Sequence, residues 1–469
     1  MLGAAVAVES HPAWCACDPQ HLNQCTIDLF QGPVLAPSRA TGLGGAFAAY
    51  AEGVDAIASN AAAVAVRMPY STNWFDYDIT VGVSFPATFR STDFDNDGQV
   101  GFAYNDFLFY TLGGQVQLGP WGFGVLTDFQ RYDVRPASGT GGTLQGTETL
   151  GRLHALVGRS FLSGLLSVGM GIRAVTLAID TQQNNQRQTQ LTMNGIGPEV
   201  GLLIRPDYEP WRLGATFRAP VNNHIGSSGE PGMQLAQPGS IALPFELELG
   251  AAIQVGPRPL NPHWLDPHDQ EERVRRQIED DRELRQAAQR AELERLPDDG
   301  QRAARKDQLD YQERFVRQEQ DERLERASEA LSLERKARYA NWPRERITVL
   351  LELLVSGPAA HDAIGLESFF GAQLGGSALL TSGQNISYSP RLGLEGEPVP
   401  DFLQTRIGTY IEPSRFERRL ARQHFTFGFD VKLFSFGLFD LFSQIWRIGG
   451  FADLAPRYQN FGVSIGAWH

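Results

Sequence analysis

The sequence contains few cysteines and no long apolar run. Only 3 of its 469 residues are Cys, which excludes a disulfide-dense secreted scaffold. No stretch approaches the ~18 uncharged apolar residues that a membrane-spanning helix needs, so a helical membrane protein is also excluded. Basic residues are in deficit, with 41 Lys+Arg against 54 Asp+Glu and a formal net charge of −13. Because nucleic acids favour a basic surface, a nucleic-acid partner is not expected.

Catalytic signatures are lacking as well. The sequence has no G-x-S-x-G nucleophile elbow, no H-E-x-x-H zinc motif and no phosphate-binding P-loop. It therefore does not predict an enzyme. Glycine and phenylalanine are abundant instead, with 49 and 28 residues.

Charge is concentrated between Pro262 and Glu345, where almost every second residue is charged. The segment is rich in Arg, Glu, Gln, Ala and Leu, which favour helices. A Pro- and Gly-containing break at 296–300 predicts two antiparallel helices, over 269–296 and 301–340. Apolar positions are too sparse for a globular core. Two interpretations stay open: a solvated coiled-coil-like hairpin, or an arm that docks a periplasmic or outer-membrane protein partner through 262–345.

Outside this segment, apolar and polar residues alternate, as in 77–85, 245–255 and 425–433. Strict alternation places one residue class on each face of a strand. The predicted strands often reach ten residues, longer than the average of five or six, and their polar faces carry Gly, Thr, Gln and isolated charges. This pattern is typical of an outer-membrane barrel, which must close because lipid offers no hydrogen bonds to backbone groups.

The alternation predicts fourteen strands, an even number as bacterial barrels require. Short connections alternate with long ones, and short turns face the periplasm in this class. The inserted hairpin at 257–345 replaces one of the short turns, which predicts that it lies in the periplasm. The strands are expected at 76–86, 106–118, 121–132, 148–160, 165–179, 190–205, 210–219, 243–256, 346–356, 387–398, 402–412, 423–434, 437–447 and 459–468.

The fold class expected from these patterns is an all-β transmembrane barrel of about 14 antiparallel strands with an inserted α-helical hairpin, and a resemblance of the N-terminal segment, described next, adds an N-terminal plug. The predicted parts are an N-terminal extension and hatch at 1–70, barrel strands 1–8 at 71–256, the hairpin at 257–345 and strands 9–14 at 346–469.

A Gly-rich segment precedes the first strand. It reads Arg-Ala-Thr-Gly-Leu-Gly-Gly-Ala-Phe over 39–47 and continues through Ala-Glu-Gly-Val-Asp-Ala over 51–56 to Asn60. Gly42, Gly44 and Gly45 permit close backbone approach or a positive φ. The segment resembles the plug of FadL-type outer-membrane transport barrels, and residues 391–416 are similar to the penultimate hairpins of that family. The hairpin insertion and the terminal His469, where an aromatic residue is usual, depart from the family pattern.

The resemblance implies a fourteen-stranded barrel with a small N-terminal hatch, and many members of the family carry hydrophobic compounds. The leading hypothesis is therefore passive transport of small hydrophobic molecules across the outer membrane of a Gram-negative-type bacterium, with outer-membrane lipid around the barrel. The alternative is a structural barrel that anchors a multiprotein envelope complex through its periplasmic arm.

Charged side chains are expected on the inner faces of the strands. Because charges inside a barrel need partners, we interpret them as pairs that hold the plug in register; the alternative is a pathway that selects cargo. A lumen with so many charges is less suited to hydrophobic cargo. The expected lumen residues are Asp128, Arg173, Glu199, Arg212, Arg218, Glu246, Glu248, Glu352, Arg406, Asp430 and Lys432.

A candidate calcium loop follows the first strand. Asp93, Asp95 and Asp97 alternate before Gly98, and the backbone carbonyl of Gln99 could add a ligand. The twelfth position is Tyr104, so the bidentate Glu of an EF-hand is missing. The alternative is an acidic surface loop. No other cofactor is expected.

The three cysteines, Cys15, Cys17 and Cys25, lie before the plug. In an oxidising compartment two of them could form a disulfide and leave one over, and the pairing stays open. A C-x-C metal site would lack a fourth ligand. Residues 1–10 contain an apolar run without a basic start, which resembles a truncated signal peptide.

Overall fold

The computed structural model describes residues 17, 21–67, 71, 73–89, 92–98, 103–135, 145–183, 186–224, 237–264, 266–374, 379–417, 419–438 and 442–468. The chain divides into two compact units. The first comprises Met1–Met68, Tyr77–Pro262 and Arg344–His469, and the second comprises Pro69–Asp76 and His263–Pro343.

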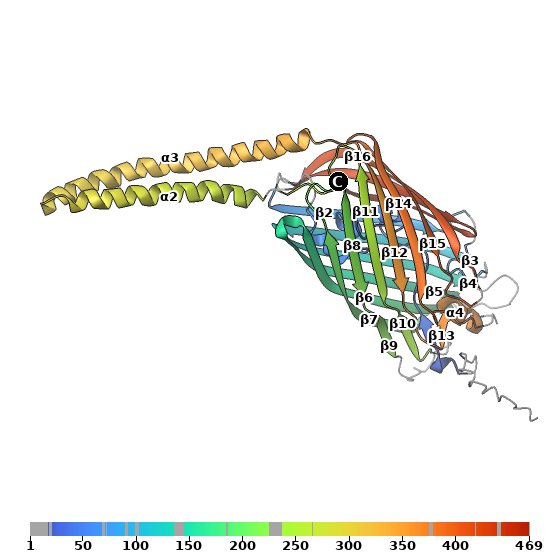
Figure 1. Cartoon of the computed structure of the whole chain (residues 1–469). Helices are drawn as coiled ribbons and strands as arrows, with labels where there is room; N and C mark the ends of the chain where they lie inside the picture. The colour runs from blue at the N-terminus through green and yellow to red at the C-terminus, as the bar shows by residue number, and fades with distance from the viewer. Residues whose placement is uncertain are drawn as a thin grey trace, which may run out of the picture. The chain divides into compact units, whose positions relative to one another are not determined.

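The first unit is a closed barrel of antiparallel strands (Figure 1). This confirms the fold class predicted from the alternation. Short connections such as 119–120 and 400–402 define one end of the barrel, here called the turn end, and long connections such as 219–245 define the other, the loop end. The fourteen strands are β2 (Phe75–Pro86), β3 (Ala103–Leu118), β4 (Trp121–Arg135), β5 (Gln145–Phe161), β6 (Leu166–Gln183), β7 (Gln186–Ile204), β8 (Trp211–Arg218), β11 (Glu246–Val255), β12 (Ile347–Ser356), β14 (Ser387–Val399), β15 (Leu403–Glu412), β16 (Arg422–Leu438), β17 (Phe442–Ala455) and β18 (Tyr458–Ala467).

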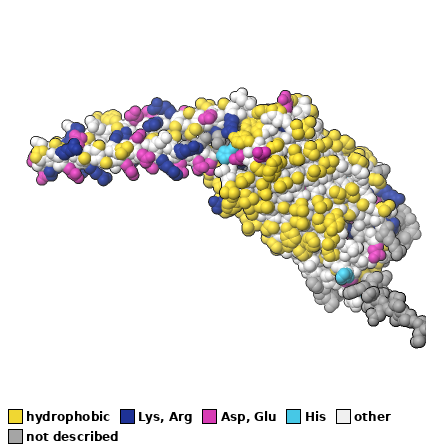
Figure 2. Space-filling model, viewed as in Figure 1, with side chains coloured by type: hydrophobic (Ala, Val, Ile, Leu, Met, Phe, Trp, Pro, Cys, Tyr) yellow, Lys and Arg dark blue, Asp and Glu magenta, His cyan; other side chains and the backbone are white. Residues whose placement is uncertain are grey.

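The outer surface of the barrel is apolar because the alternation directs one face of each strand outward. Phe427 on β16 is 49% exposed, whereas its neighbour Thr426 is fully buried. Figure 2 shows hydrophobic side chains over most of the barrel face in view. The barrel is therefore the reverse of a water-soluble sandwich, with its polar residues inside and its apolar residues outside.

The predicted bounds of one late strand are wrong. Residues 437–447 were expected to form the thirteenth strand, but β16 extends to Leu438 and β17 runs over Phe442–Ala455. The register of β16 against β17 shifts between Lys432 and Ser435. Because such an irregularity breaks the period-two pattern, the alternation alone could not show where β16 ends.

The plug consists of short helical turns inside the barrel: α1 (Ser38–Gly42), η2 (Val54–Ala56) and η3 (Ala61–Ala65). Its residues are almost all buried. The wall is lined with glycines where the plug approaches. A Cβ at Gly201 would lie 2.7 Å from the backbone nitrogen of Ala61, and a Cβ at Gly428 would lie 3.1 Å from the Cα of Gly42. The wall therefore accommodates the plug backbone only because side chains are missing there.

The residues that precede the plug lie at the loop end of the barrel. Their strand β1 (Thr26–Asp28), which follows η1 (Leu22–Gln24), pairs in parallel with both β10 (Ser240–Leu243) and β13 (Ala363–Gly365), and β10 pairs with β9 (Val221–His224). These partners, with α4 (Leu366–Leu374), belong to the two longest loop-end connections of the barrel unit. The chain therefore passes from a small sheet at the loop end into the plug.

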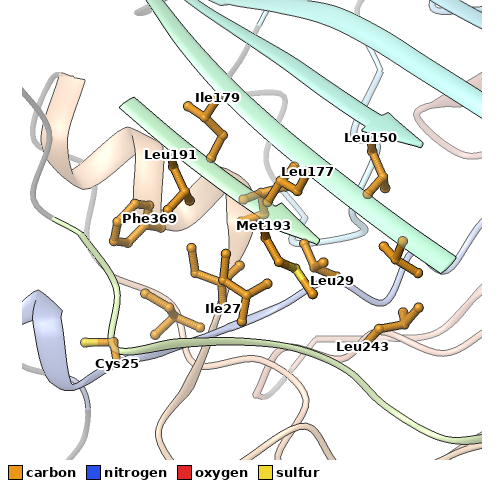
Figure 3. Close-up of a cluster of buried hydrophobic side chains, with 14 of the residues drawn as sticks. Cys25, Ile27, Leu29, Leu150, Leu177, Ile179, Leu191, Met193, Leu243 and Phe369 are labelled. Atoms are coloured by element: carbon orange, nitrogen blue, oxygen red, sulfur yellow. The ribbon is translucent and has the colours of Figure 1, made fainter. Parts of the chain in front are cut away.

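An apolar cluster holds this small sheet (Figure 3). Ile27 and Leu29 from the N-terminal segment pack with Leu177, Met193 and other side chains from the barrel wall. A disulfide joins Cys17 to Cys25, the latter fully buried. Cys15 lies outside the described residues.

The second unit contains the predicted hairpin, as α2 (Pro267–Glu294) and α3 (Asp299–Ala340) (Figure 1). Asp266 caps α2 by accepting a hydrogen bond from the backbone N–H of His268, with Pro267 in the first turn. The helices are antiparallel and joined by polar contacts, including Ser328 Oγ to Glu271 Oε1 at 2.8 Å and Arg305 Nε to Glu292 Oε1 at 2.8 Å. Among the described helices, none has the apolar length to cross a membrane.

The wall glycines generate a prediction. A Cβ at Gly122 would overlap the carbonyl oxygen of Val64 in the plug, whereas a Cβ at the half-buried Gly114 would have its nearest neighbour 3.9 Å away. We expect Gly122→Val to destabilise the seated plug by about 1–3 kcal/mol, as overpacking does. Limited proteolysis should then cut within 38–67 faster than in the wild type.

Gly114→Val is the matched control, because it adds the same side chain to a paired strand away from the plug. It should leave the proteolysis rate of residues 38–67 unchanged. Equal rates for Gly122→Val and the wild type would show that the plug does not rest against Gly122.

Candidate functional site: the plug and its seat in the lumen

A carboxylate on the barrel wall gathers three guanidinium groups around the plug. Glu395 on β14 accepts hydrogen bonds from Arg39 of α1, with Nε and Nη2 each at 3.1 Å. Arg346 and Arg406 each contact Glu395 at 2.6 Å, and the hydroxyl of Tyr50 donates to it at 2.9 Å. All of these side chains are buried. One wall residue therefore joins the plug to two further arginines of the barrel unit.

A second ion pair holds the next plug segment. Arg212 on β8 contacts Glu52 at 2.8 Å and donates to the carbonyl oxygen of Tyr50 at 2.8 Å. Burial alone would raise the pKa of Glu52, but Arg212 and Arg39 outweigh it and lower this pKa to about 2. Glu52 is consequently charged at neutral pH.

A third set of contacts continues around the lumen. Asp430 on β16 lies 2.7 Å from Arg406 and 2.9 Å from Arg447, and Arg447 also pairs with Asp55 of η2. Arg406 therefore joins this set to the Glu395 group. The charges form a connected network, in which removing one member leaves its partners buried and unpaired.

Wall side chains also satisfy the backbone of the plug. Glu352 accepts hydrogen bonds from the backbone N–H groups of Phe47 and Ala48, at 2.9 and 2.7 Å. Asn60 donates to the carbonyl oxygen of Ala48 at 2.8 Å and caps η3 by accepting from the N–H of Ala62. These wall contacts supplement the turns of the plug, in which many N–H groups already donate to backbone carbonyls.

A polar cavity of about 90 Å³ lies beside the plug. Arg173 pairs with Glu246 at 2.6 Å, and Arg218 pairs with Glu248 at 2.9 Å and lies 3.5 Å from Glu199. All of these except Glu199 line the cavity, as do Asp128, His154 and Arg391. The space has room for several water molecules. Its lining is charged, so it is not an apolar cargo pocket.

The structure places most of the predicted lumen residues in these groups. Lys432 is the exception, since it pairs at 2.6 Å with Asp401 of the β14–β15 turn and away from the plug. Gly44 and Gly45 have φ of 64° and 79°, values that favour glycine. Gly42 faces Gly428 across a close backbone approach.

Several residues that join the plug to the barrel wall were not predicted from the sequence. Arg39, Glu52 and Asp55 lie in the plug segment, where no periodicity marks a face. Glu395 and Arg447 lie on strands β14 and β17, whose faces the alternation did not resolve. Arg391, Glu395 and Glu397 do follow a period of two along β14. That signal could have identified Glu395.

The predicted calcium loop is compact. Carboxylate oxygens of Asp93, Asp95 and Asp97 all lie within 4.8 Å of one another. Gln99 lies outside the described residues.

The depressed pKa of Glu52 generates a prediction. Its folded-state value of about 2 is below the ordinary 4.5, so the charge stabilises the seated plug fully above pH 4.5. This contribution is lost as the pH falls from 4.5 toward 2, and at neutral pH it is roughly 3 kcal/mol. We expect Glu52→Gln to speed hydrogen exchange of residues 38–66 at pH 7. The difference from the wild type, corrected for intrinsic exchange, should shrink as the pH falls through this window.

Glu329→Gln is the matched control, because Glu329 is exposed on α3. It should exchange like the wild type at every pH. A Glu52→Gln effect of the same size at pH 7 and pH 2 would contradict an ionised Glu52 in the seat.

No family model and no curated protein matches this sequence. Among solved structures, a FadL homologue of Pseudomonas aeruginosa is similar, with a TM-score of 0.50 at 9% identity over 93% of this chain and 99% of that chain. The toluene transporter TodX of Pseudomonas putida has a TM-score of 0.45 at 12% identity, over 93% and 99% of the two chains. The CymD monoaromatic hydrocarbon channel has 0.44 at 9%, over 92% and 98%. The chain therefore has the FadL-type fold, a closed fourteen-stranded barrel with an N-terminal plug.

Proposed function

We propose that the protein is an outer-membrane channel through which small hydrophobic molecules move passively, with the N-terminal plug controlling passage. The observation that carries the proposal is a closed barrel with an apolar outer surface whose lumen holds a plug on ion pairs. The FadL-type fold supports it, since the similar solved structures include a toluene transporter and a monoaromatic hydrocarbon channel. A channel of this kind carries no catalytic group.

The outer surface supports a location in the outer membrane of a Gram-negative-type bacterium. Closed barrels satisfy every backbone group internally, as the lipid interior demands. The hairpin is inserted between β11 and β12, a connection at the turn end. Because short turns face the periplasm in outer-membrane barrels, we propose that the hairpin lies in the periplasm.

The contacts between the plug and the barrel wall support a gating role. The cavity beside the plug has charged side chains in its lining and has room for only several water molecules, so hydrophobic cargo could pass only if plug residues moved. Many of the contacts between plug and wall are ion pairs and hydrogen bonds, which water can replace. Apolar contacts such as those of Phe47 and Val64 add to them, so a shift of the plug must also part these side chains.

A reversible cross-link tests the proposal. The hydroxyls of Ser38 in α1 and Ser464 in β18 are hydrogen-bonded to each other, so a cysteine pair there is within disulfide reach. We expect Ser38→Cys plus Ser464→Cys, once oxidised, to lower the initial rate of toluene uptake at least tenfold. Uptake would be measured in whole cells lacking other hydrocarbon channels, and reduction should restore it.

Ser464→Cys alone is the control and should transport like the wild type under both conditions. If the oxidised double variant keeps the wild-type rate, the plug does not gate uptake. If wild-type cells take up toluene no faster than cells carrying an empty vector, the channel proposal for this cargo fails.

The second candidate function is an anchor for an envelope complex. The observation that favours it is the hairpin, on which Leu284, Tyr311, Phe315 and Leu333 are all more than half exposed. Tyr311 and Phe315 contact each other, with ring centroids 5.0 Å apart, and this exposed aromatic pair suits a protein partner better than solvent.

Deletion of 263–343 separates the two functions. If the protein is a channel, toluene uptake should stay within about twofold of the wild type, because the plug and the wall are untouched. If it is an anchor, a complex cross-linked to the full-length chain in cells should be lost. Replacing the hairpin with a flexible linker of equal length controls for strain at the β11–β12 connection.

A further inference from the structure

The connection between β2 and β3 presents three acidic side chains on a tight loop. The carboxylates of Asp93, Asp95 and Asp97 offer one oxygen each within 4.8 Å of one another. Gly98, with φ of 82°, allows the chain to turn immediately after them. Alternate carboxylates on such a turn converge on a single point.

A fourth carboxylate reaches the loop from a distant part of the chain. Glu367 lies in the first turn of α4, in the connection between β12 and β14, and its side chain is buried. Glu367 and Asp95 line the same cavity. Carboxylates that share one cavity can contribute oxygens to one cation.

The loop also contains a buried oxygen that lacks a partner. Asp93 is 3% exposed, and its Oδ2 accepts a hydrogen bond from the backbone N–H of Gly98 at 3.1 Å. Its Oδ1 has no hydrogen-bond partner among the described residues. A buried carboxylate oxygen is costly unless it binds a donor or a cation.

The backbone of the loop is held independently of any ion. Arg422 donates to the carbonyl oxygens of Asp93 and Phe94, and Ser414 donates to that of Asn96 at 2.9 Å. Arg422 is itself paired with Glu412 at 2.6 Å. The acidic side chains are therefore placed by contacts that need no cation.

We propose that Asp93, Asp95, Asp97 and Glu367 bind one hard divalent cation, of which calcium is the best match. Calcium takes carboxylate oxygens in flexible arrangements, whereas magnesium requires near-ideal octahedral geometry. The ion ties the β2–β3 connection to α4 and so joins two long connections at the loop end. Extracellular calcium modules bind with Kd of about 10⁻⁴–10⁻³ M. This range fits a loop end that faces the outside of the cell. The outward orientation rests on the proposed function, whereas the binding of calcium is independent of it.

Calorimetric titration of the purified, chelator-treated protein with calcium chloride tests the proposal. The wild type should show one saturable site. Asp95→Asn plus Asp97→Asn should weaken binding at least a hundredfold, and Glu367→Gln about tenfold. The matched control, Asp307→Asn plus Asp310→Asn, removes two exposed carboxylates of α3 and should bind like the wild type.

Three results would overturn the proposal: no saturable binding to the wild type, unchanged binding to Asp95→Asn plus Asp97→Asn, or unchanged binding to Glu367→Gln. Should the double variant fail to fold, Asp97→Asn alone decides, with the same direction expected. None of these results depends on transport, so failure here is distinct from failure of the channel proposal.

Discussion

The structure depends on buried charge pairing inside a closed barrel. Most apolar residues of the strands face outward, so the lumen combines small apolar clusters with many buried charges. The plug enters it through charges that find opposite charges on the wall, with Glu395 and Arg39 in the densest group. Each such group would be costly alone, and the network is stable only because nearly every member has a partner.

This constraint explains why the wall carries glycine where the plug approaches. Close backbone contact at Gly201 and Gly428 brings plug amides and carbonyls within reach of wall side chains such as Glu352. Larger residues there would hold the plug away from its partners. The polar contacts, the small wall residues and the apolar clusters between plug and wall together fix the position of the plug.

The barrel and the hairpin could be predicted from the sequence because both depend on local periodicity. Alternation along 77–85 and 425–433 specified strands with one apolar face, and the Pro and Gly residues at 296–300 marked the turn between α2 and α3. The bounds of β17 could not be predicted because the register shift after Lys432 interrupts the pattern. Most of the lumen charges could be predicted because the period of two that marks a strand also marks its inner face. Arg39 and Glu52 could not, because they lie in irregular chain that has no such period.

The sequence by itself determined which strand faces are apolar, and with them the closed barrel, because side-chain direction in a strand alternates residue by residue. Only the tertiary structure decided which charges meet. Glu395 and Arg39 are 356 residues apart, and Asp95 lines one cavity with Glu367, which follows it by more than half of the chain. Such pairings depend on how the barrel closes, on the registers of its strands and on the path of the N-terminal segment through the lumen, and no local pattern encodes these.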